Sequence, residues 1–399
     1  MIYVYILLLR IVGYLEGTPK IIAFLIVFSL MSYSTGKRIP LKELHKISKY
    51  NFYAILISLS MIVHGFIFGK VMVRDIAVLL SFWIWLVFSY TYFKDKTIRQ
   101  CLKFVLISFL IFNIANYIIF KLFFGAQKIG INNTMSMFGV FGYRIYFPLA
   151  SGANVFAAQL AFNCLIVLYF IKTSANKYLY ILIYAFYIMM LVLADSRLLL
   201  FLATIFSFIY WFSLNTLITF FKKFWWAIGI GLFAFLYVFY NTNLFDSFKR
   251  AGELEGRALS RVKIWGIAKE VIFSDYHFLT GRGLNGFAEG MPESFKKTFH
   301  GQHLQTSHNF LIQTIIDFGV LGVIIILYLI FEILKMVLKL KSSIINVLII
   351  MILLIGVTES IPSFYSTEPT LFFIAILSII LTHYERENTG IFKSSDVLS

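Results

Sequence analysis

Long apolar stretches separated by short polar ones run along almost the whole chain. Many of them approach the roughly 20 residues that a helix needs to cross a bilayer, and none shows the alternation that is typical of a membrane β-strand. A bilayer offers no partner to backbone polar groups, so these stretches predict helices, which bond such groups internally. The predicted spans are Met1–Leu15, Ile21–Thr35, Phe52–Gly69, Ile76–Phe93, Phe104–Phe124, Leu149–Ile171, Tyr178–Ala194, Leu198–Phe220, Phe224–Tyr240, Asn309–Leu338, Ile344–Ile361 and Thr370–His383. We therefore expect an all-α polytopic membrane protein, a bundle of about 12 transmembrane helices.

The longest polar segment, residues 241–307, divides the predicted bundle. Before it, residues 1–240 hold the first nine predicted spans; after it, residues 308–384 hold the last three, and residues 385–399 form a polar tail. The segment is too short for an independent domain with a large core of its own.

Apolar positions within this segment predict a short helix that lies against the bundle. They are Trp265, Ile267, Val271 and Ile272, and their spacing is that of an amphipathic helix. Three glycines follow within a few residues, and this part of the segment is expected to be rich in turns; they are Gly281, Gly283 and Gly286.

Composition and charge agree with a membrane location. The chain is 60% hydrophobic and 14% charged, which is more apolar surface than a soluble protein of 399 residues can bury. The net charge of +16 does not indicate nucleic-acid binding, because the basic residues punctuate the apolar stretches instead of coating one face. Lys and Arg concentrate in alternate loops, so the positive-inside rule predicts cytoplasmic termini and places residues 241–307 on the outer face. The two cysteines offer no disulfide framework or metal spacing, and the first stretch, which contains Arg10, is interpreted as a retained span.

A histidine lies where the outer segment meets the next apolar run, in Thr306-Ser307-His308-Asn309-Phe310. Thr306 or Ser307 is predicted to cap a helix, which would put His308 in its first turn. Because the positive end of a helix disfavours imidazolium, this histidine is expected to be neutral, as a general base must be. His300 and His303 are close by, but no Asp, Glu or Cys stands beside them at ligand spacing. We favour proton transfer by a single histidine over a metal site.

Two arginines lie at the ends of predicted spans. Arg197 interrupts a long apolar tract, and an arginine close to the bilayer is costly unless it is paired or solvated. A functional role and a simpler one, as a topology marker or an ion-pair partner of Asp195, explain it about equally well. Arg144 precedes the span that opens near Asn154, and by itself it is better explained as an interface anchor.

A further basic cluster lies in the outer segment, against the positive-inside bias. Arg257 and Arg261 would share one face of a helix with Trp265. Clustered guanidinium groups suit bidentate binding of a diphosphate, although a solvated basic face paired with nearby glutamates remains open. Glu359, near the outer end of its predicted span, could pair with one of the arginines. Gly281-Arg282-Gly283 is too short to indicate a nucleotide-binding loop.

Taken in order, these features resemble the O-antigen polymerase and O-antigen ligase superfamily of bacterial polysaccharide glycosyltransferases, the Wzy-type polymerases and their relatives. The resemblance covers roughly residues 144–322. It rests on Ser196-Arg197 at a span end, on Arg261-x-x-x-Trp265 leading to Leu279-Thr280-Gly281-Arg282-Gly283, on His308-Asn309-x-x-Ile312 with Gly319-x-x-Gly322 downstream, and on Asn154 after Arg144.

The resemblance implies a GT-C-like glycosyltransferase in the bacterial cytoplasmic membrane that uses no cofactor, no nucleotide sugar and no metal. Its expected partners are a donor and an acceptor glycan carried on polyprenyl diphosphate, membrane lipid and a chain-length regulator protein, but no nucleic acid. By the resemblance, His308 is the catalytic base in an inverting displacement and Asn309 orients it or the acceptor. Arg197 and Arg261 would bind the diphosphate, with Arg257 and Arg144 as secondary candidates. Supporting roles would fall to His303, Glu359 and Trp265.

Three functions stay open. A polymerase transfers the growing chain to a fresh lipid-linked repeat unit, and we favour it because such enzymes are many and variable in sequence. A ligase transfers the chain to a finished lipid core, and the sequence offers no acceptor-specific element that separates the two. A lipid-linked oligosaccharide flippase or another transporter also suits many spans, but it needs a site that is reachable from both faces, whereas the polar residues here gather on one side.

Overall fold

The structure, a computed structural model, describes residues 85–123, 147–150, 152–212, 257–274, 277–283, 286–296, 306–340, 342–360 and 368–388, together with Ile26 and Ile145. Every regular element in these ranges is a helix. The helices are α6 (Ile98–Phe123), α7 (Ala153–Thr173), α8 (Lys177–Leu193), α9 (Arg197–Phe212), α12 (Arg257–Phe273), α13 (His277–Thr280), α14 (Gly286–Gly290), α15 (Glu293–Lys296), α17 (Phe310–Leu340), α18 (Ser343–Thr358) and α19 (Glu368–Asn388).

Three of these helices, α6, α7 and α17, contain segments long and apolar enough to cross a membrane, and α8, α9 and α18 are shorter apolar helices. The prediction of an all-α membrane protein is thus confirmed for the described part of the chain. The count of about 12 spans stays a prediction. The predicted spans Met1–Leu15, Phe52–Gly69 and Phe224–Tyr240 lie outside the described residues, as does Ile21–Thr35 apart from Ile26.

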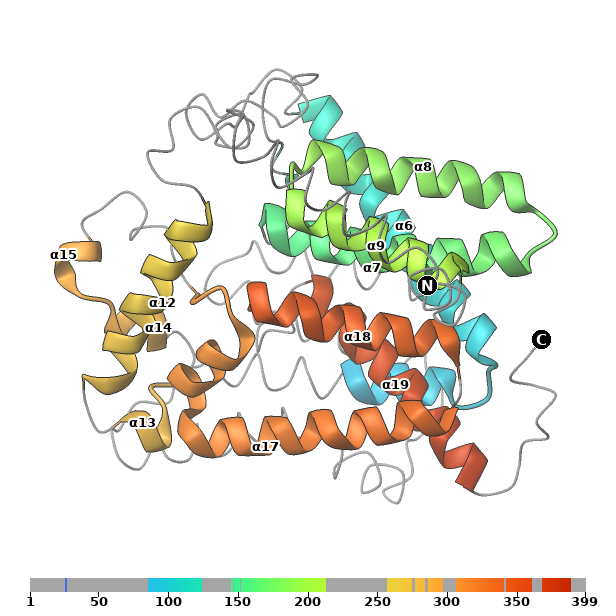
Figure 1. Cartoon of the computed structure of the whole chain (residues 1–399). Helices are drawn as coiled ribbons and strands as arrows, with labels where there is room; N and C mark the ends of the chain where they lie inside the picture. Colours follow the sequence, from blue (N-terminus) through green and yellow to red (C-terminus); the bar gives the residue numbers. More distant parts are fainter. Residues whose placement is uncertain are drawn as a thin grey trace, which may run out of the picture. The chain divides into compact units, whose positions relative to one another are not determined.

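The chain divides into two compact units, residues 118–263 and residues 1–117 with 264–399. In the first, α7 packs against both α8 and α9, and the three helices run side by side (Figure 1). Small side chains on α7 let its neighbours approach closely; they are Ala153, Ala157, Ala158 and Ala161, all buried. At one end of this unit, the ammonium group of Lys172 donates to the carbonyl oxygens of Tyr210 (3.0 Å) and Trp211 (2.9 Å). These carbonyls belong to the last turn of α9, where no intrahelical partner exists.

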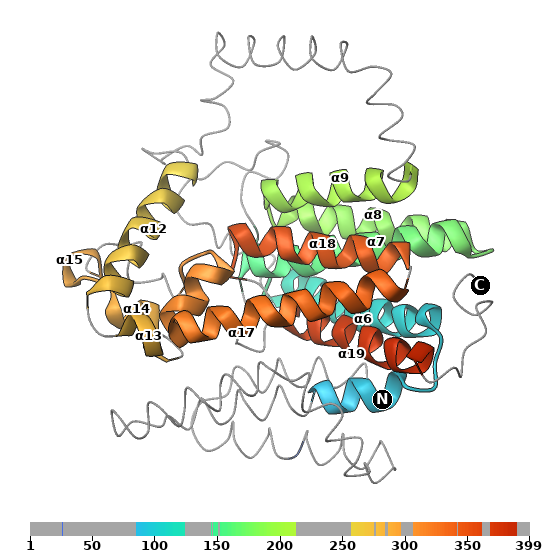
Figure 2. The same ribbon diagram turned by 60° about the horizontal axis from the view of Figure 1, so that its bottom comes forward.

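In the other unit, α17, α18 and α19 pack against one another (Figure 2). The segment before α6 is fastened to α19 by three contacts. Trp85 Nε1 donates to the carbonyl oxygen of Leu371 (2.9 Å), Arg386 donates to that of Lys96 (2.9 Å), and the Tyr90 hydroxyl donates to the Glu385 carboxylate.

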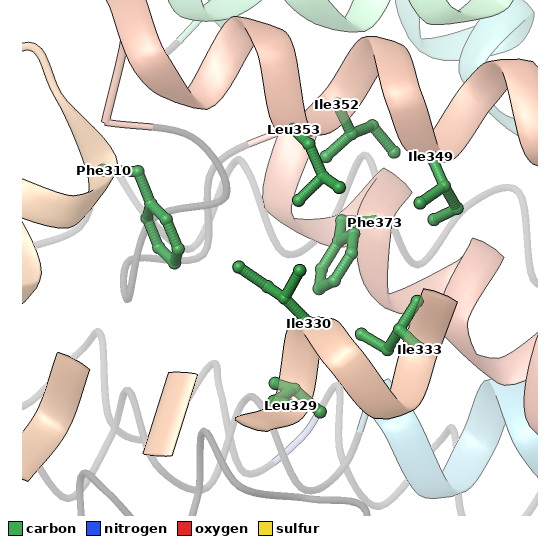
Figure 3. Close-up of a pocket in the computed structure, with 8 residues that line it drawn as sticks. All are labelled: Phe310, Leu329, Ile330, Ile333, Ile349, Ile352, Leu353 and Phe373. Carbon is green, nitrogen blue, oxygen red and sulfur yellow. The ribbon is translucent and has the colours of Figure 1, made fainter. Parts of the chain in front are cut away.

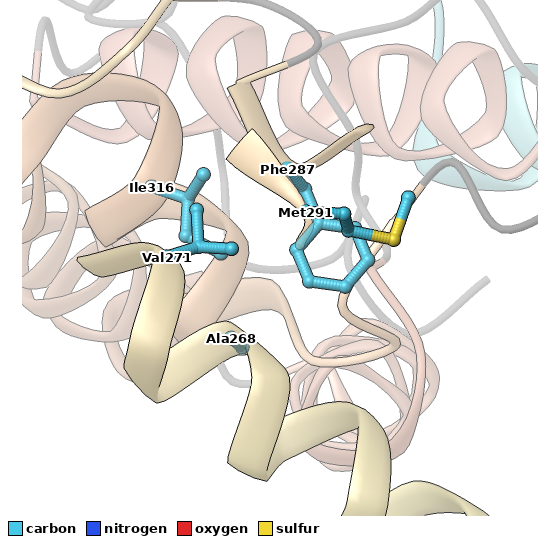
Figure 4. Packing of buried hydrophobic residues seen from close by; sticks show 5 residues of the cluster. All are labelled: Ala268, Val271, Phe287, Met291 and Ile316. Carbon is cyan, nitrogen blue, oxygen red and sulfur yellow. The ribbon is translucent and has the colours of Figure 1, made fainter. Parts of the chain in front are cut away.

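Short helices within residues 257–296 gather around the N-terminal part of α17 (Figures 1 and 2). Their buried side chains form a small core with Ile316 of α17, made of Ala268, Val271, Phe287 and Met291 (Figure 4). The amphipathic helix predicted from Trp265 to Ile272 is confirmed as part of α12, which buries Val271 and partly buries Ile267 and Ile272. This small core fixes the described helices of segment 241–307 to the first part of α17, which begins two residues after His308.

Candidate functional site

His308 and Glu359 form a pair where the start of α17 meets the end of α18. The imidazole Nδ1 lies 3.0 Å from Glu359 Oε2, although the two residues are 51 positions apart. The carboxylate side chain is 4% exposed and the imidazole is 30% exposed. A buried carboxylate is costly unless it has a partner, and the imidazole supplies one while keeping part of its ring accessible.

The cap of α17 differs from the sequence-based expectation. The helix begins at Phe310, and its capping residue is Asn309, whose Oδ1 accepts a hydrogen bond from the N–H of Ile312 (2.9 Å). The predictions that Thr306 or Ser307 caps the helix and that His308 lies in its first turn are therefore wrong. The other end of the Asn309 amide explains the shift, because Nδ2 donates to the carbonyl oxygen of Val357 at the end of α18 (2.9 Å). Asn309 both caps α17 and ties it to α18.

His308 itself lies outside the helix, with a φ of 52°. This left-handed conformation is uncommon for a residue other than glycine. The described hydrogen-bond partner of the His308 imidazole is the Glu359 carboxylate.

Buried polar groups fix the backbone on either side of His308. The Ser307 N–H donates to Gln313 Oε1 (2.8 Å), and Gln313 Nε2 donates to Asp317 Oδ1 (2.9 Å). All three residues are buried, at 0–3% exposure. In such surroundings polar contacts are strong and costly to break, so the first turns of α17 hold the segment that precedes them.

A break in α17 at Gly319 separates this short first part from the longer apolar part that follows. Gly319 has a φ of 67° and a ψ of −169°, so the carbonyls just before it lose their helical partners. The loop after α13 replaces them: the Arg282 N–H donates to Ile316 O (2.7 Å) and the Gly283 N–H to Asp317 O (2.9 Å). The segment Leu279–Gly283 is thus inserted, backbone to backbone, into the break of the helix.

Glycines make this insertion possible. A Cβ on Gly281 would lie 2.3 Å from Asp317 O, and one on Gly319 would lie 2.1 Å from Leu279 O. Gly322 is also confined, by the side chain of Phe318. Two motifs that are separate in the sequence therefore form one structural unit. They are the stretch Leu279–Gly283 and the pair Gly319 and Gly322. Sequence reasoning missed this; the glycine pairs were the only available signal.

The side chain of Arg282 serves the same loop. Its Nε donates to the carbonyl oxygen of Val271 (3.2 Å) and its Nη2 to the Ser274 hydroxyl (2.7 Å). These partners lie at the end of α12, where carbonyls lack helical donors. Arg282 therefore joins the end of α12 to the loop that is inserted into the break of α17.

Arg197 belongs to a second polar cluster, in the other unit. It is the first residue of α9, and its Nε lies 3.9 Å from Oδ1 of the buried Asp195. The N-terminus of a helix does not stabilise a cation, so the helix dipole does not account for the position of Arg197. Ser196 Oγ donates to Asn154 Oδ1 (3.4 Å) at the start of α7. The backbone of Ile145, the residue after Arg144, donates to Leu193 O (3.0 Å) at the end of α8.

The structure describes the other predicted site residues to different extents. Arg144 and His303 lie outside the described residues. Arg257 and Arg261 lie in the first turns of α12, as the prediction of a shared helical face requires, but their side chains are outside the described part. Trp265 is half-buried, and its indole N–H has no hydrogen-bond partner among the described residues. Glu359 pairs with His308, and its pairing with an arginine stays a prediction.

Neither unit contains a described cluster that suits a metal. Among the residues that the structure describes, no three His, Cys, Asp or Glu side chains are arranged to hold a metal ion. Of the three neighbouring histidines considered for a metal site, only His308 is described.

An apolar pocket lies between α17, α18 and α19 (Figure 3). It is lined by Phe310, Leu329, Ile330, Ile333, Ile349, Ile352, Leu353 and Phe373. Phe310 directly follows the capping Asn309 and stands apart from the other labelled side chains in Figure 3. The pocket therefore begins beside the segment that carries His308.

A family comparison covers part of each polar cluster. Residues 180–327 match a family model described as O-antigen ligase. The matched range includes Arg197, all of α12, the loop Leu279–Gly283 and the stretch from His308 to Gly322, and it ends before Glu359. A search of curated proteins finds no match to the chain. The match over residues 180–327 supports the resemblance of this membrane protein to the O-antigen polymerase and ligase superfamily.

Proposed function

We propose that this protein is a glycosyltransferase that joins lipid-linked oligosaccharide repeat units into a surface polysaccharide, an O-antigen or a capsule. The observation that carries the proposal is the His308–Glu359 pair, with its partly exposed imidazole beside an apolar pocket. The family match supports a membrane enzyme of the ligase or polymerase kind. Polymerisation is our choice between the two.

The positions of basic residues support catalysis at the outer face of the bacterial cytoplasmic membrane. From His308, α17 runs to Lys339, whose ammonium group lies over the Tyr384 ring (5.2 Å to its centre), and α18 returns to Glu359. In the other unit, α8 runs from Lys177 to the turn that holds Arg197. Basic residues favour the cytoplasmic side. In each unit the candidate cluster lies at the opposite end, so we assign both clusters to the outer face and the termini to the cytoplasm.

The proposed reaction is a single inverting displacement. His308 takes the proton of the attacking sugar hydroxyl, and the hydroxyl oxygen forms a bond to the anomeric carbon of the donor. The bond from that carbon to the diphosphate breaks, and its electron pair leaves with the polyprenyl diphosphate. Asn309 contributes by holding the start of α17 to α18, which fixes the segment that carries the base.

The diphosphate that leaves is strongly anionic and needs compensation. Arginine is suited to this because its planar fork matches two phosphate oxygens and its charge persists at every physiological pH. We assign this role to Arg197 and Arg261, with Arg257 and Arg144 in support. Arginines in this role make a divalent cation unnecessary.

The pocket suits the lipid part of the donor. Its eight lining residues are all apolar, as a polyprenyl chain requires. Phe310 connects the pocket to the segment of His308, so a chain bound there would bring its diphosphate end toward the imidazole. We propose the pocket as the place where the first isoprene units of the carrier bind.

Transfer to a finished lipid core is the second candidate, and the description of the matched family favours it. The discriminating experiment supplies the purified protein in lipid nanodiscs with a lipid-linked repeat unit, with and without a lipid core. Polymer on the carrier lipid is the expected result. Transfer only to the core would identify the protein as a ligase. The absence of both products would favour a transporter over either enzyme.

The same assay tests the base. His308→Ala is expected to abolish polymer formation while protein level and membrane insertion are retained. Thr306→Ala is the matched control, because Thr306 is half-buried in the same segment and is not assigned a role. Normal product from His308→Ala would remove His308 from the mechanism.

A further inference from the structure

Three features fix His308 more firmly than capping of α17 requires. Its backbone adopts the left-handed conformation. Its Nδ1 is held at 3.0 Å by Oε2 of the buried Glu359. On its other side, Asn309 binds the end of the helix that leads to Glu359, through Val357 O. A strained backbone persists only where its surroundings hold it, and here they hold the imidazole against one carboxylate.

We propose that Glu359 is a positioning residue that selects the tautomer of His308. This inference rests on the function proposed above and adds a residue to it, one that lies beyond the family match. An ionised carboxylate can only accept hydrogen bonds. Glu359 therefore binds the tautomer of His308 that carries its proton on Nδ1, and Nε2 is left with a lone pair.

The free nitrogen is the one that the reaction needs. Nε2 of His308 has no hydrogen-bond partner among the described residues, and the imidazole is 30% exposed. The lone pair of Nε2 takes the proton of the acceptor hydroxyl as the new bond to the anomeric carbon forms and the diphosphate departs. The imidazolium that results carries protons on both nitrogens. Glu359 stabilises it through the contact to Nδ1, and the proton then returns to the medium or to the released diphosphate.

A purely structural role for Glu359 makes a different prediction. As an ordinary bridge between helices, it would duplicate the bond between Asn309 and Val357. A neutral side chain of the same shape would then serve nearly as well. As a selector of the tautomer, Glu359 is not equivalent to glutamine, because the amide can donate to Nδ1 as well as accept from it and so no longer enforces the tautomer with its proton on Nδ1.

The test compares Glu359→Gln and Glu359→Asp with the wild type, in nanodiscs, with the lipid-linked repeat unit as substrate. Glu359→Gln is expected to lower kcat by about 10²- to 10⁴-fold with little change in KM, the range typical of losing a general base or its orienting carboxylate. Glu359→Asp, which keeps the charge, should recover part of the loss. Glu332→Gln is the control, because Glu332 lies on α17 and pairs with Lys335 (4.0 Å) away from the site.

A second measurement does not depend on any variant of Glu359. Selective ¹⁵N labelling of histidine distinguishes the two neutral tautomers, and comparison with His308→Gln assigns the signal of His308. The wild-type protein is expected to carry the proton on Nδ1, and Glu359→Gln to lose this preference. A wild-type His308 with its neutral-form proton on Nε2 would overturn the proposal.

The outcomes separate this inference from the function on which it rests. Full activity of Glu359→Gln, with His308→Ala inactive, would refute the role of Glu359 and leave the base assignment standing. Full activity of His308→Ala would refute the base assignment itself. Equal loss in Glu359→Gln and Glu359→Asp, with the Nδ1 tautomer unchanged in both, would reduce Glu359 to a structural residue.

Discussion

Alanine at Gly281 or Gly319 tests whether the loop Leu279–Gly283 closes the break in α17. The added Cβ would lie 2.3 Å from Asp317 O in the first variant and 2.1 Å from Leu279 O in the second. Real Cβ atoms essentially never come within 3.0 Å of another heavy atom, so the two backbones must move apart. Both glycines also have a positive φ, of 75° and 67°, which an alanine adopts only with strain.

The cost can be worked out from these contacts. The left-handed conformation costs an L residue about 1–2 kcal/mol. Separation of the backbones breaks the bonds that Ile316 O and Asp317 O accept from the loop. A buried carbonyl left without a partner costs about 1–3 kcal/mol, so the loss of one such bond brings the total to about 2–5 kcal/mol.

Gly266 provides the matched control. It lies in the interior of α12, it is exposed, and a Cβ there would meet no heavy atom within 4 Å. Alanine at this helical position is expected to stabilise by about 0.5–1 kcal/mol. The same substitution should therefore have opposite signs at these sites.

The assay is the apparent melting temperature in detergent, followed by the amount of monodisperse protein that survives heating. Gly281→Ala and Gly319→Ala should melt several degrees below the wild type, and Gly266→Ala should melt no lower than it. Melting temperatures for Gly281→Ala and Gly319→Ala that match that of Gly266→Ala would refute the insertion of the loop into α17.

Three further predictions concern the site. Arg197→Lys and Arg261→Lys keep the charge but lose the planar fork, so activity should fall by about 10- to 100-fold. The control, Arg99→Lys in the first turn of α6, should have no effect. Full activity of both site variants would argue against bidentate diphosphate contacts. Asn309→Ala should destabilise the protein by about 1 kcal/mol through loss of the cap. Asn309→Asp should destabilise it by less, because aspartate keeps the acceptor for Ile312 N–H. Equal melting temperatures of the two variants would contradict the capping role. Activity should survive a chelator if arginines alone compensate the diphosphate, and loss of activity on chelation, restored by one specific ion, would show that a metal takes part.

The sequence predicts the helices well because burial in a bilayer demands long apolar runs. α7, α8 and α18 each begin and end within four residues of the predicted spans. The interruption at Asp195 was also identified, and there the backbone leaves the helix with a φ of 46°. These features depend on local composition, which one sequence displays directly.

The predicted span Asn309–Leu338 starts within one residue of α17, but its capping residue was misassigned because several neighbouring residues can cap a helix. Ser, Thr and Asn differ little as caps, and the choice was made by a contact to Val357, 48 positions away. The partner of Glu359 was missed for the same reason, since nothing in the local sequence links it to His308. The break at Gly319 lies inside an apolar run, where a glycine alone does not distinguish a kink from a continuous helix.

The break in α17 at Gly319 has two consequences for the site. The residues before Gly319 carry His308 and Asn309 to the end of α18, and they also place Phe310 in the pocket with Ile330 and Leu353. The residues after it, 320–340, are by themselves close to the roughly 20 that a span requires. A continuous helix would align Phe310 with the rest of α17 and separate it from the residues that it joins in the pocket. In the proposed reaction, the same loop insertion therefore sets both the position of the base and the place where the lipid binds. Gly319→Ala should accordingly lower kcat and raise KM for the lipid-linked donor together.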